Sequence, residues 1–350
     1  MGPDEVPTTG LDPDASGFIQ IDGFPPLPRA TYKGDGFGGA GETYTRIALD
    51  CEGLVLGPDR SFWISDEYGP YIYQFSEQGK MIRAIQPPPA FLPLRNGTFS
   101  FSSAEPPIFE RDRLPFPTNP TAGRANNQGF EGLTMSSDGK SIYAMMQSAM
   151  NQEGGPKKKF RRQARLLEYD ISGQQPALLH EFIVTLPLYD DGNDIEAATQ
   201  SEIHKLPNGQ FLILARDSGF GRGEDETESK YRHVDIFSTD RATDIAGSVR
   251  DSVNGSVASN RGALDPGLLN ATYCPFLDYN INSELKKFGL HNGGDQDASL
   301  LNEKWESLAL VPIAEAGSNI SSEYFLFSMS DNDFMTQDGT ICFFIELPIG

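Results

Sequence analysis

The sequence predicts an all-β protein, a β-propeller of six or seven blades with long loop insertions. Three observations predict this fold class: frequent turn residues, short apolar runs between them, and one unit that recurs along the chain. There are 36 glycines and 25 prolines in 350 residues, and Asn-Gly, Asp-Gly and Pro clusters separate the strand-like runs. Helical patterns are scarce, and only Asp194–Gln200 and Asn282–Phe288 are predicted as short helices. A recurring unit of several strands is typical of propeller blades.

Each copy of the recurring unit opens with a glutamate before a short apolar segment, and a second strand follows that ends in polar residues. The four copies open at Glu52, Glu131, Glu202 and Glu306. Their second strands are predicted over Ser61–Glu67, Ser141–Ser148, Gln210–Asp217 and Glu323–Asp333. In the first three copies the glutamate and the polar end lie about 14 to 16 residues apart, which suits a β-hairpin with a tight turn.

Further strands complete the predicted blades. Third strands are expected over Tyr71–Ser76, Arg165–Asp170 and His233–Ser238, and fourth strands over Met81–Ile85 and Ala177–Val184. Two segments, Pro87–Gly123 and Gly247–Asp297, are expected to be long insertions. No linker divides the chain, so residues 34–350 are predicted to form a single domain, and residues 1–33 an N-terminal extension or partial blade.

The geometry of the unit makes a spatial prediction. In an antiparallel hairpin the second strand returns to the end at which the first begins. The first strand of each blade lines the central channel of a propeller. The glutamates are therefore expected to converge at one mouth of the channel, beside the polar ends of the second strands. Those ends supply Asp66, Glu67, Gln147, Arg216, Asp217, Asp331, Asn332 and Asp333.

Composition restricts the class of partner. The net charge is −21, from 28 basic and 49 acidic residues. Such a surface repels nucleic acids and anionic membranes and attracts cations. No segment approaches the roughly 18 apolar residues of a membrane span. Together with the acidic, turn-rich composition, four N-glycosylation sequons indicate a secreted glycoprotein. Their asparagines are Asn96, Asn254, Asn270 and Asn319.

Carboxylates brought together at the mouth would repel one another unless they bind a metal, pair with arginine or lysine, or share protons. A donor set made only of oxygen suits Ca²⁺, and another divalent cation is also possible. The predicted metal ligands are Glu52, Glu131, Glu202, Glu306, Asp66 and Asn332. In the alternative interpretation, each glutamate instead caps backbone amides where blades meet.

A cation at the mouth could polarise a carbonyl or phosphoryl oxygen, or lower the pKa of a bound water. Arg216 is the candidate for holding a substrate oxygen, with a structural Arg–Asp pair as the alternative. Asp217 or Asp331 is the candidate general base, and Glu67 is a further catalytic candidate. No dinucleotide fingerprint follows a strand, so no organic cofactor is predicted.

These motifs carry a family resemblance. The segments Glu52–Leu54, Gly129–Leu133, Ala215–Asp217 and Glu306–Ala309, with Asp331–Phe334 after a strand, resemble the phytase-like family, also described as esterase-like activity of phytase. The resemblance runs in order from about Gly34 to Phe334. It implies a secreted β-propeller with a phosphate- or ester-directed hydrolase function. The third copy departs from the pattern, because Ser201-Glu202-Ile203 stands where Glu-Gly-Leu stands in the first two copies.

Two functions follow from these expectations. The first is a metal-dependent hydrolase that acts on a carboxylic ester, lactone or phosphoester at the channel mouth. A lactonase is included because calcium propellers with a carboxylate mouth resemble gluconolactonase-type enzymes. The alternative is a non-catalytic ligand-binding propeller whose calcium is structural. Metal content, followed by activity before and after chelation, would distinguish the two.

Overall fold

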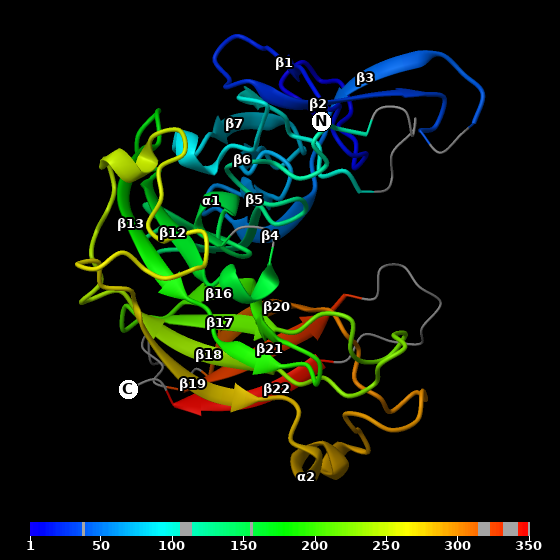
Figure 1. The fold of residues 1–350 in the computed structure, drawn as a ribbon, viewed down its shortest axis with the longest axis vertical. Helices are drawn as coiled ribbons and strands as arrows, with labels where there is room; N and C mark the ends of the chain where they lie inside the picture. The colour runs from blue at the N-terminus through cyan, green and yellow to red at the C-terminus, as the bar shows by residue number, and fades with distance from the viewer. Residues whose placement is uncertain (37–38, 106–113, 155–156, 314–322, 332–341, 349–350) are drawn as a thin grey trace. The chain divides into compact units, whose positions relative to one another are not determined.

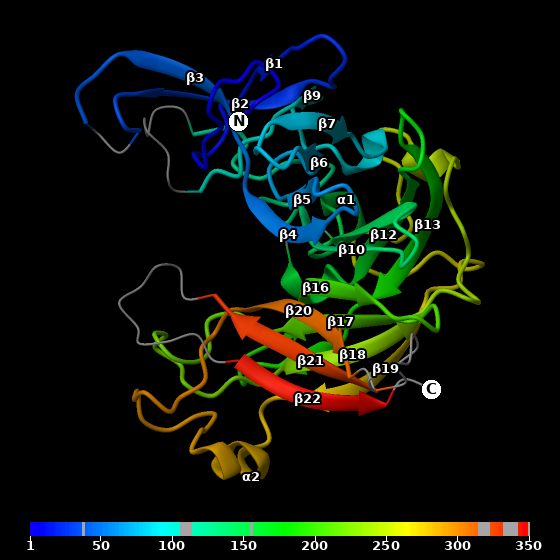
Figure 2. The same ribbon diagram turned by 180° about the vertical axis from the view of Figure 1, so that it is seen from behind.

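The computed structural model describes residues 1–350 apart from 37–38, 106–113, 155–156, 314–322, 332–341 and 349–350. Strands make up most of its regular secondary structure (Figures 1 and 2). The chain folds into two compact units. Unit 1 contains Met1–Ile183 and Thr243–Leu269, and unit 2 contains Val184–Ala242 and Asn270–Gly350.

Unit 1 contains two four-stranded antiparallel sheets, each with its strands side by side in chain order. The first sheet consists of β4 (Cys51–Leu56), β5 (Phe62–Asp66), β6 (Ile72–Phe75) and β7 (Met81–Ile85). The second consists of β10 (Phe130–Met135), β11 (Ser141–Met146), β12 (Gln163–Asp170) and β13 (Ala177–Thr185).

The smaller elements of unit 1 lie before, within, between and after these sheets in the chain. A three-stranded sheet contains β1 (Phe18–Ile19), β2 (Leu27–Lys33) and β3 (Thr43–Ile47), and a hairpin contains β8 (Leu94–Arg95) and β9 (Thr98–Phe99). The single-turn helices are η1 (Pro89–Phe91), α1 (Asn151–Gly154), η3 (Lys158–Phe160) and η4 (Val249–Asp251). Residues 1–33 therefore supply two strands of a sheet that β3 completes.

Unit 2 contains one four-stranded and one three-stranded meander. The first consists of β16 (Thr199–Lys205), β17 (Phe211–Arg216), β18 (Arg232–Ser238) and β19 (Thr272–Asp278), and the second of β20 (Trp305–Pro312), β21 (Glu323–Ser330) and β22 (Cys342–Pro348). The smaller elements are β14 (Leu188–Asp190), β15 (Ile195–Ala197), α2 (Asn282–Leu285) and η5 (Lys286–Phe288).

These meanders are the blades that the sequence predicts, and the all-β fold class of propeller type is confirmed. The total of six or seven blades stays a prediction. The helix at Asn282–Phe288 is present as α2 and η5, whereas the helix at Asp194–Gln200 is wrong. Ile195–Ala197 pairs with Leu188–Asp190 in a hairpin instead. Gly192 adopts a positive φ of 94° in the turn, which a residue with a Cβ rarely accepts. The predicted insertion Gly247–Asp297 also proves to contain a blade strand, β19.

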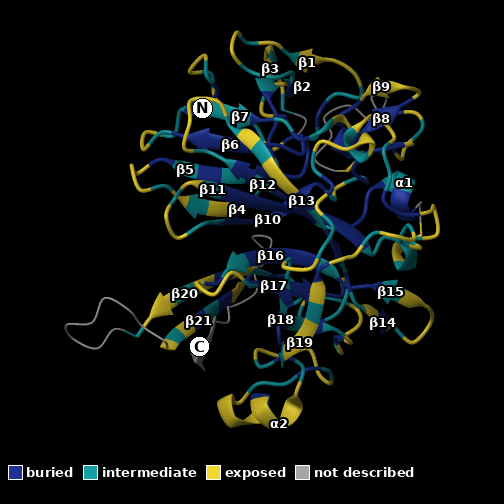
Figure 3. Ribbon diagram, turned by 90° about the vertical axis from the view of Figure 1, so that its left-hand side faces the viewer, coloured by how far each residue is buried: buried dark blue, intermediate teal, exposed yellow. Residues whose placement is uncertain are grey.

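The middle strands of the blades are apolar and largely buried. Every residue of β17 is buried, and so are five of the six residues of β11. Figure 3 shows the buried strands β11 and β17 in dark blue, in contrast to α2, which is largely exposed and drawn in yellow. In unit 1, Trp63 from β5 and Phe130 from β10 belong to one apolar cluster. In unit 2, Leu214 from β17 and Trp305 from β20 belong to another. Within each unit, an apolar core therefore lies between the two blades.

The segment Thr243–Leu269 leaves β18 in unit 2 and packs within unit 1. Its apolar residues Ile245 and Val257 pack on Ile183 of β13. The Ile245 amide donates to the Glu181 carbonyl at 3.0 Å, and the Val257 amide donates to Glu153 Oε1 at 2.8 Å. We call this part of the chain the 243–269 segment.

A buried ion cluster fixes the 243–269 segment to the second blade. Arg165, Glu153 and Glu181 have fully buried side chains. The Arg165 guanidinium donates to Glu153 Oε1 at 3.1 Å and to Glu181 Oε1 at 2.7 Å. It also donates to the Arg250 carbonyl of the 243–269 segment at 3.2 Å. One cation thus serves two carboxylates where no water reaches them.

Three carboxyl groups with a pKa raised by burial, one of them Glu181 of this cluster, predict that the protein is more stable at acidic pH. Burial raises the pKa of Glu181 to about 8, against the attraction of Arg165, and the neighbouring Asp251 carboxyl raises it further. Burial likewise raises the pKa of Asp66 to about 7 and of Asp12 to about 6. The folded state therefore holds protons that the unfolded chain has released above about pH 4, so the free energy of unfolding falls as pH rises from about 4 to 8.

Urea unfolding at pH 5 and at pH 8 measures the effect. The free energy of unfolding should be larger at pH 5, by an amount on the order of 2 kcal/mol for Glu181 alone. The Glu181→Gln variant removes the titrating group and should show a smaller slope. A free energy that stays level or rises between pH 5 and pH 8 would contradict this assignment.

Candidate functional site

The first strand of each blade is irregular at the recurring position. In β4, Cys51 pairs with Asp66 and the register shifts before Leu54. The same shift follows Phe130 in β10 and Trp305 in β20. A bulge of this kind changes the direction of a side chain next to a sheet edge. The residues directly after these shifted pairs are Glu52, Glu131 and Glu306.

The third copy follows the same rule with a different residue. Thr199 pairs with Arg216, and the register shifts between Gln200 and Glu202. The last pair before the shift is Gln200 with Ala215, so the residue directly after it is Ser201, which is buried. Glu202 lies further along, paired with Leu214 inside the ladder. The alignment of Glu202 with the other three glutamates is thus corrected by one residue, and the third copy carries a serine hydroxyl at the recurring position.

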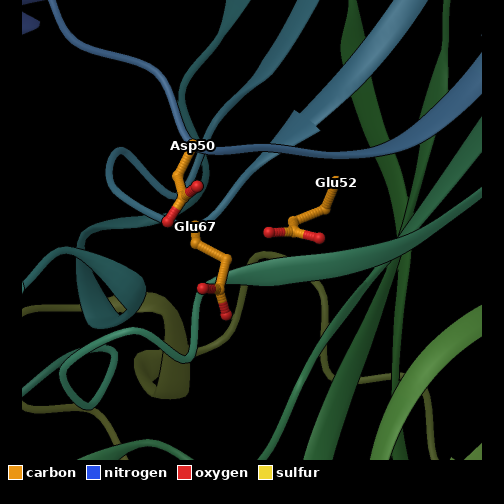
Figure 4. Close-up of side chains that lie close together, drawn as sticks. All are labelled: Asp50, Glu52 and Glu67. Carbon is orange, nitrogen blue, oxygen red and sulfur yellow. The ribbon is translucent and has the colours of Figure 1, made fainter. Parts of the chain in front are cut away.

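Three carboxylates of unit 1 lie together at the end of β4 and β5. Asp50 precedes β4, Glu52 lies within it, and Glu67 follows β5. One oxygen of each lies within 4.8 Å of one oxygen of the other two. Figure 4 shows the three carboxylates facing a common space. Asp50 and Glu52 are half-buried, and Glu67 is buried at 1% exposure. We call these three residues the carboxylate cluster.

Asp66 holds the backbone around this cluster. Its carboxylate accepts from the backbone amides of Asp50 at 2.8 Å, Tyr68 at 3.2 Å and Gly69 at 2.8 Å, and from the Tyr73 hydroxyl at 3.2 Å. The Glu67 amide in turn donates to the Asp50 carbonyl at 3.0 Å. These contacts occupy both oxygens of Asp66, so they favour a positioning role for it over that of a metal ligand.

The variant Asp66→Asn tests this positioning role. The amide nitrogen of asparagine cannot accept from the backbone N–H groups that one carboxylate oxygen now serves. We expect a loss of about 1–3 kcal/mol in the free energy of unfolding, with a weaker cation affinity at the cluster. Thermal unfolding and calorimetric titration with Ca²⁺ measure the two effects. A variant with the stability and the cation affinity of the parent would exclude the role.

A buried arginine, Arg124, lies near the cluster. The Arg124 side chain is completely buried, and Glu67 is among the carboxylates that act on its charge. Its guanidinium donates to the carbonyls of Tyr68 at 3.1 Å, Ala125 at 3.3 Å and Phe101. Backbone carbonyls therefore receive these hydrogen bonds.

Glu131 lies at the same end of the second blade, buried at 3% exposure. Gln147, which follows β11, donates through Nε2 to its Oε1. The Glu131 carbonyl accepts from the Ser65 hydroxyl at 2.6 Å, and that hydroxyl accepts from the Gly53 amide at 2.8 Å. Unit 1 thus places the polar ends of two second strands beside the glutamates of their first strands, as the hairpin geometry predicts.

In unit 2 the recurring glutamate Glu306 forms an ion pair with Arg216. The Arg216 guanidinium donates to Glu306 Oε1 at 2.5 Å and to the Ser201 hydroxyl at 3.0 Å. Glu303 lies 3.8 Å from Arg216, and Lys304 lies 3.9 Å from Glu306. Two cations therefore face two carboxylates, which favours the structural alternative for Arg216 and Glu306.

Asp217 is also held by its own blade. Its carboxylate accepts from the Ser229 hydroxyl at 2.9 Å and from the backbone amides of Lys230 and Tyr231. Burial raises its pKa against these hydrogen bonds. Glu202 accepts from the amide of Ile203 at 2.7 Å. Asp217 and Glu202 thus both accept hydrogen bonds from backbone amides. This is the role that the alternative interpretation expects for the carboxylates of the repeat.

The remaining predicted residues lie at the end of β21. Asp331 is exposed, and its amide donates to the Lys304 carbonyl at 2.7 Å. Asn332 and Asp333 lie outside the described residues. The convergence of all four copies on one mouth stays a prediction, because the copies are divided between the two units.

Sequence reasoning missed Asp50. The other three copies have Gly129, Thr199 and Lys304 at this position, so it is not part of the repeat. A signal was present nonetheless. Asp50 and Glu52 are two residues apart, and alternate residues of a strand face the same side. Among the described residues, the carboxylate cluster is the group of acidic, histidine or cysteine side chains close enough to hold one metal ion.

Three comparisons place the chain among known proteins. A family profile described as Phytase-like, esterase-like activity of phytase, matches residues 7–334. A protein of Arthroderma benhamiae described as "Uncharacterized secreted protein" is 58% identical over 348 residues, which cover 97% of this chain and 68% of that protein. The predicted secreted location is confirmed by this relative. No helix of the described part of the chain is long and apolar enough to cross a membrane.

A solved structure was also matched, that of Drosophila Plexin A in complex with Semaphorin 1b. The match covers 97% of this chain and 81% of that chain, with 8% sequence identity and a TM-score of 0.28. A likeness of that size carries no inference about this chain.

Proposed function

The chain belongs to the phytase-like family, and from that premise we propose that it is a secreted, cation-dependent hydrolase of ester bonds with its centre at the carboxylate cluster. The substrate is a carboxylic ester, a lactone or a phosphoester. The observation that carries the proposal is the approach of Asp50, Glu52 and Glu67 to within 4.8 Å of one another.

The donor set of the cluster fits a hard divalent cation. It offers only carboxylate oxygens, the ligands that Ca²⁺ prefers in proteins, and its flexible side chains suit Ca²⁺ better than the stricter octahedral Mg²⁺. Three carboxylates this close repel one another unless a cation or a proton lies between them. When bound, a cation there would polarise a substrate oxygen or lower the pKa of a water.

The three carboxylates have different proposed roles. Asp50 and Glu52 are half-buried and reach solvent, so they are the proposed ligands of the cation. Glu67 is buried, and it is the proposed acceptor of the proton that an attacking water loses. Asp66 keeps Asp50 and the turn after β5 in place through its backbone hydrogen bonds.

Other catalytic candidates have weaker support. The Arg216 guanidinium is held by Glu306, and Asp217 is held by the amides of Lys230 and Tyr231. Asp331 is exposed and remains a candidate base. Of the catalytic candidates, Glu67 is the one that also belongs to the carboxylate cluster.

Turnover with and without metal tests the proposal. The purified protein is assayed against chromogenic carboxylic esters, lactones and phosphomonoesters, then after chelation, and again after addition of Ca²⁺, Mn²⁺ or Mg²⁺. The proposal expects one substrate class to be hydrolysed, the activity to fall on chelation, and Ca²⁺ to restore it. Activity that survives complete chelation would exclude cation dependence.

The alternative function is a binding propeller whose calcium is structural. It is favoured by the partly buried Arg216–Glu306 ion pair and by the capped Asp217, because such contacts stabilise the fold itself. This alternative predicts that chelation lowers the melting temperature while none of the three substrate classes is hydrolysed in any metal-loaded state.

A further inference from the structure

We propose that Asn96, Asn254 and Asn270 carry N-linked glycans. Each begins an Asn-x-Ser/Thr sequon, with Thr98, Ser256 and Thr272 as the third residues. The middle residues are Gly97, Gly255 and Ala271, none of which is the proline that blocks this modification. The fourth sequon, at Asn319, lies outside the described residues.

All three asparagines are exposed on turns or at a strand end. Asn96 lies in the turn between β8 and β9, and its φ is 51°. Asn270 comes two residues before β19 begins. A glycan is bulky and strongly hydrated, so only an asparagine that faces solvent can carry one in the folded protein. A secreted location, as described for the relative from Arthroderma benhamiae, gives the chain access to this modification.

Asn254 lies on a turn whose backbone is held by hydrogen bonds. It is exposed at the tip of a turn in the 243–269 segment and has a positive φ of 61°. The next residue holds this turn to unit 1, because the Gly255 carbonyl accepts from Gln152 Nε2 at 3.1 Å and from Arg165 Nη2 at 3.3 Å. The backbone of the turn is therefore fixed while the Asn254 side chain faces solvent.

The other two asparagines use their amides locally. Asn96 Nδ2 donates to the Phe116 carbonyl at 3.0 Å, and Asn270 Nδ2 donates to the Ala271 carbonyl at 3.2 Å. Both bonds are exposed or only partly buried, so replacing them by water costs little. Neither bond prevents the side chain from carrying a sugar.

Site mapping of the secreted protein tests the proposal. The full chain is expressed through the secretory pathway of a yeast, and peptide N-glycosidase F is applied in ¹⁸O-labelled water, which converts each glycosylated asparagine to labelled aspartate. We expect the label at Asn96, Asn254 and Asn270. An unlabelled peptide that contains one of these residues overturns the assignment of that residue.

Matched variants separate glycosylation from chemical deamidation and from folding defects. Asn254→Gln and Ser256→Ala should each remove one glycan from the intact mass, whereas Ser256→Thr should keep it. Asn208→Gln is the control, because Asn208 lies in an exposed Asn-Gly turn that is not a sequon. Its intact mass should keep every glycan. A Ser256→Ala protein with the same glycan mass as the parent would overturn the site at Asn254.

Discussion

The variant Glu52→Gln is expected to lose saturable Ca²⁺ binding and to hydrolyse the ester substrate at least roughly 100-fold more slowly than the parent. The change removes one negative charge and one ligand oxygen from the carboxylate cluster and keeps the shape of the side chain. Asp50 alone then has to hold the cation beside Glu67. Isothermal titration calorimetry and kcat/KM on the same preparations measure both effects.

Two further variants sharpen the prediction. Glu67→Gln should retain most of the Ca²⁺ affinity and lose turnover, because Glu67 is the proposed proton acceptor. Glu77→Gln is the matched control, since Glu77 belongs to the same blade but forms an exposed pair with Arg60 at 2.9 Å. It should bind Ca²⁺ and turn over substrate as the parent does. A Glu52→Gln protein with unchanged affinity and turnover would exclude the cluster as the centre.

The second large effect concerns stability. The variant Arg165→Met is expected to lose about 3–5 kcal/mol of the free energy of unfolding at pH 7, because it leaves the buried Glu153 carboxylate without a cation. A domain of ordinary stability has only about 5–15 kcal/mol in total. Urea unfolding measures the loss. Because Arg165 also donates to the Arg250 carbonyl, proteolysis should become faster within the 243–269 segment.

Two controls apply to the Arg165 prediction. Arg60→Met removes an arginine of an exposed pair, with 79% of its side chain accessible, and should change stability by less than about 1 kcal/mol. The double variant Arg165→Met/Glu153→Gln removes both charges and should recover part of the loss. An Arg165→Met protein within about 1 kcal/mol of the parent would show that the cluster does not hold the fold together.

Much of the fold could be predicted from the sequence, because blades obey local rules. The fourth strand of the first blade is predicted at Met81–Ile85 and found at those residues. Turn residues and apolar runs set these boundaries. The helix predicted at Asp194–Gln200 failed because its residues pair with a strand, and that partner is not apparent in the local sequence. The strand β19 was missed because it lies inside a polar stretch.

The candidate site was predicted less well, since it depends on register. A bulge of one residue decides that Ser201, and not Glu202, occupies the recurring position. Counting along the sequence cannot detect a bulge. Likewise, the spacing brought Arg216 and Asp217 to the correct end of their blade, but only the structure identifies Glu306 and the amides after Ser229 as their partners. Local patterns therefore located the mouth residues, and tertiary contacts assigned their roles.

The most direct test of the central claim is the anomalous difference density of crystals grown with Ca²⁺ and, separately, with Mn²⁺. We expect one strong anomalous peak bound by the carboxylates of Asp50 and Glu52, with Glu67 beside it. Crystals of Glu52→Gln should lack that peak. Density for a metal elsewhere, with hydrogen-bonded waters alone among the three carboxylates, would contradict the account.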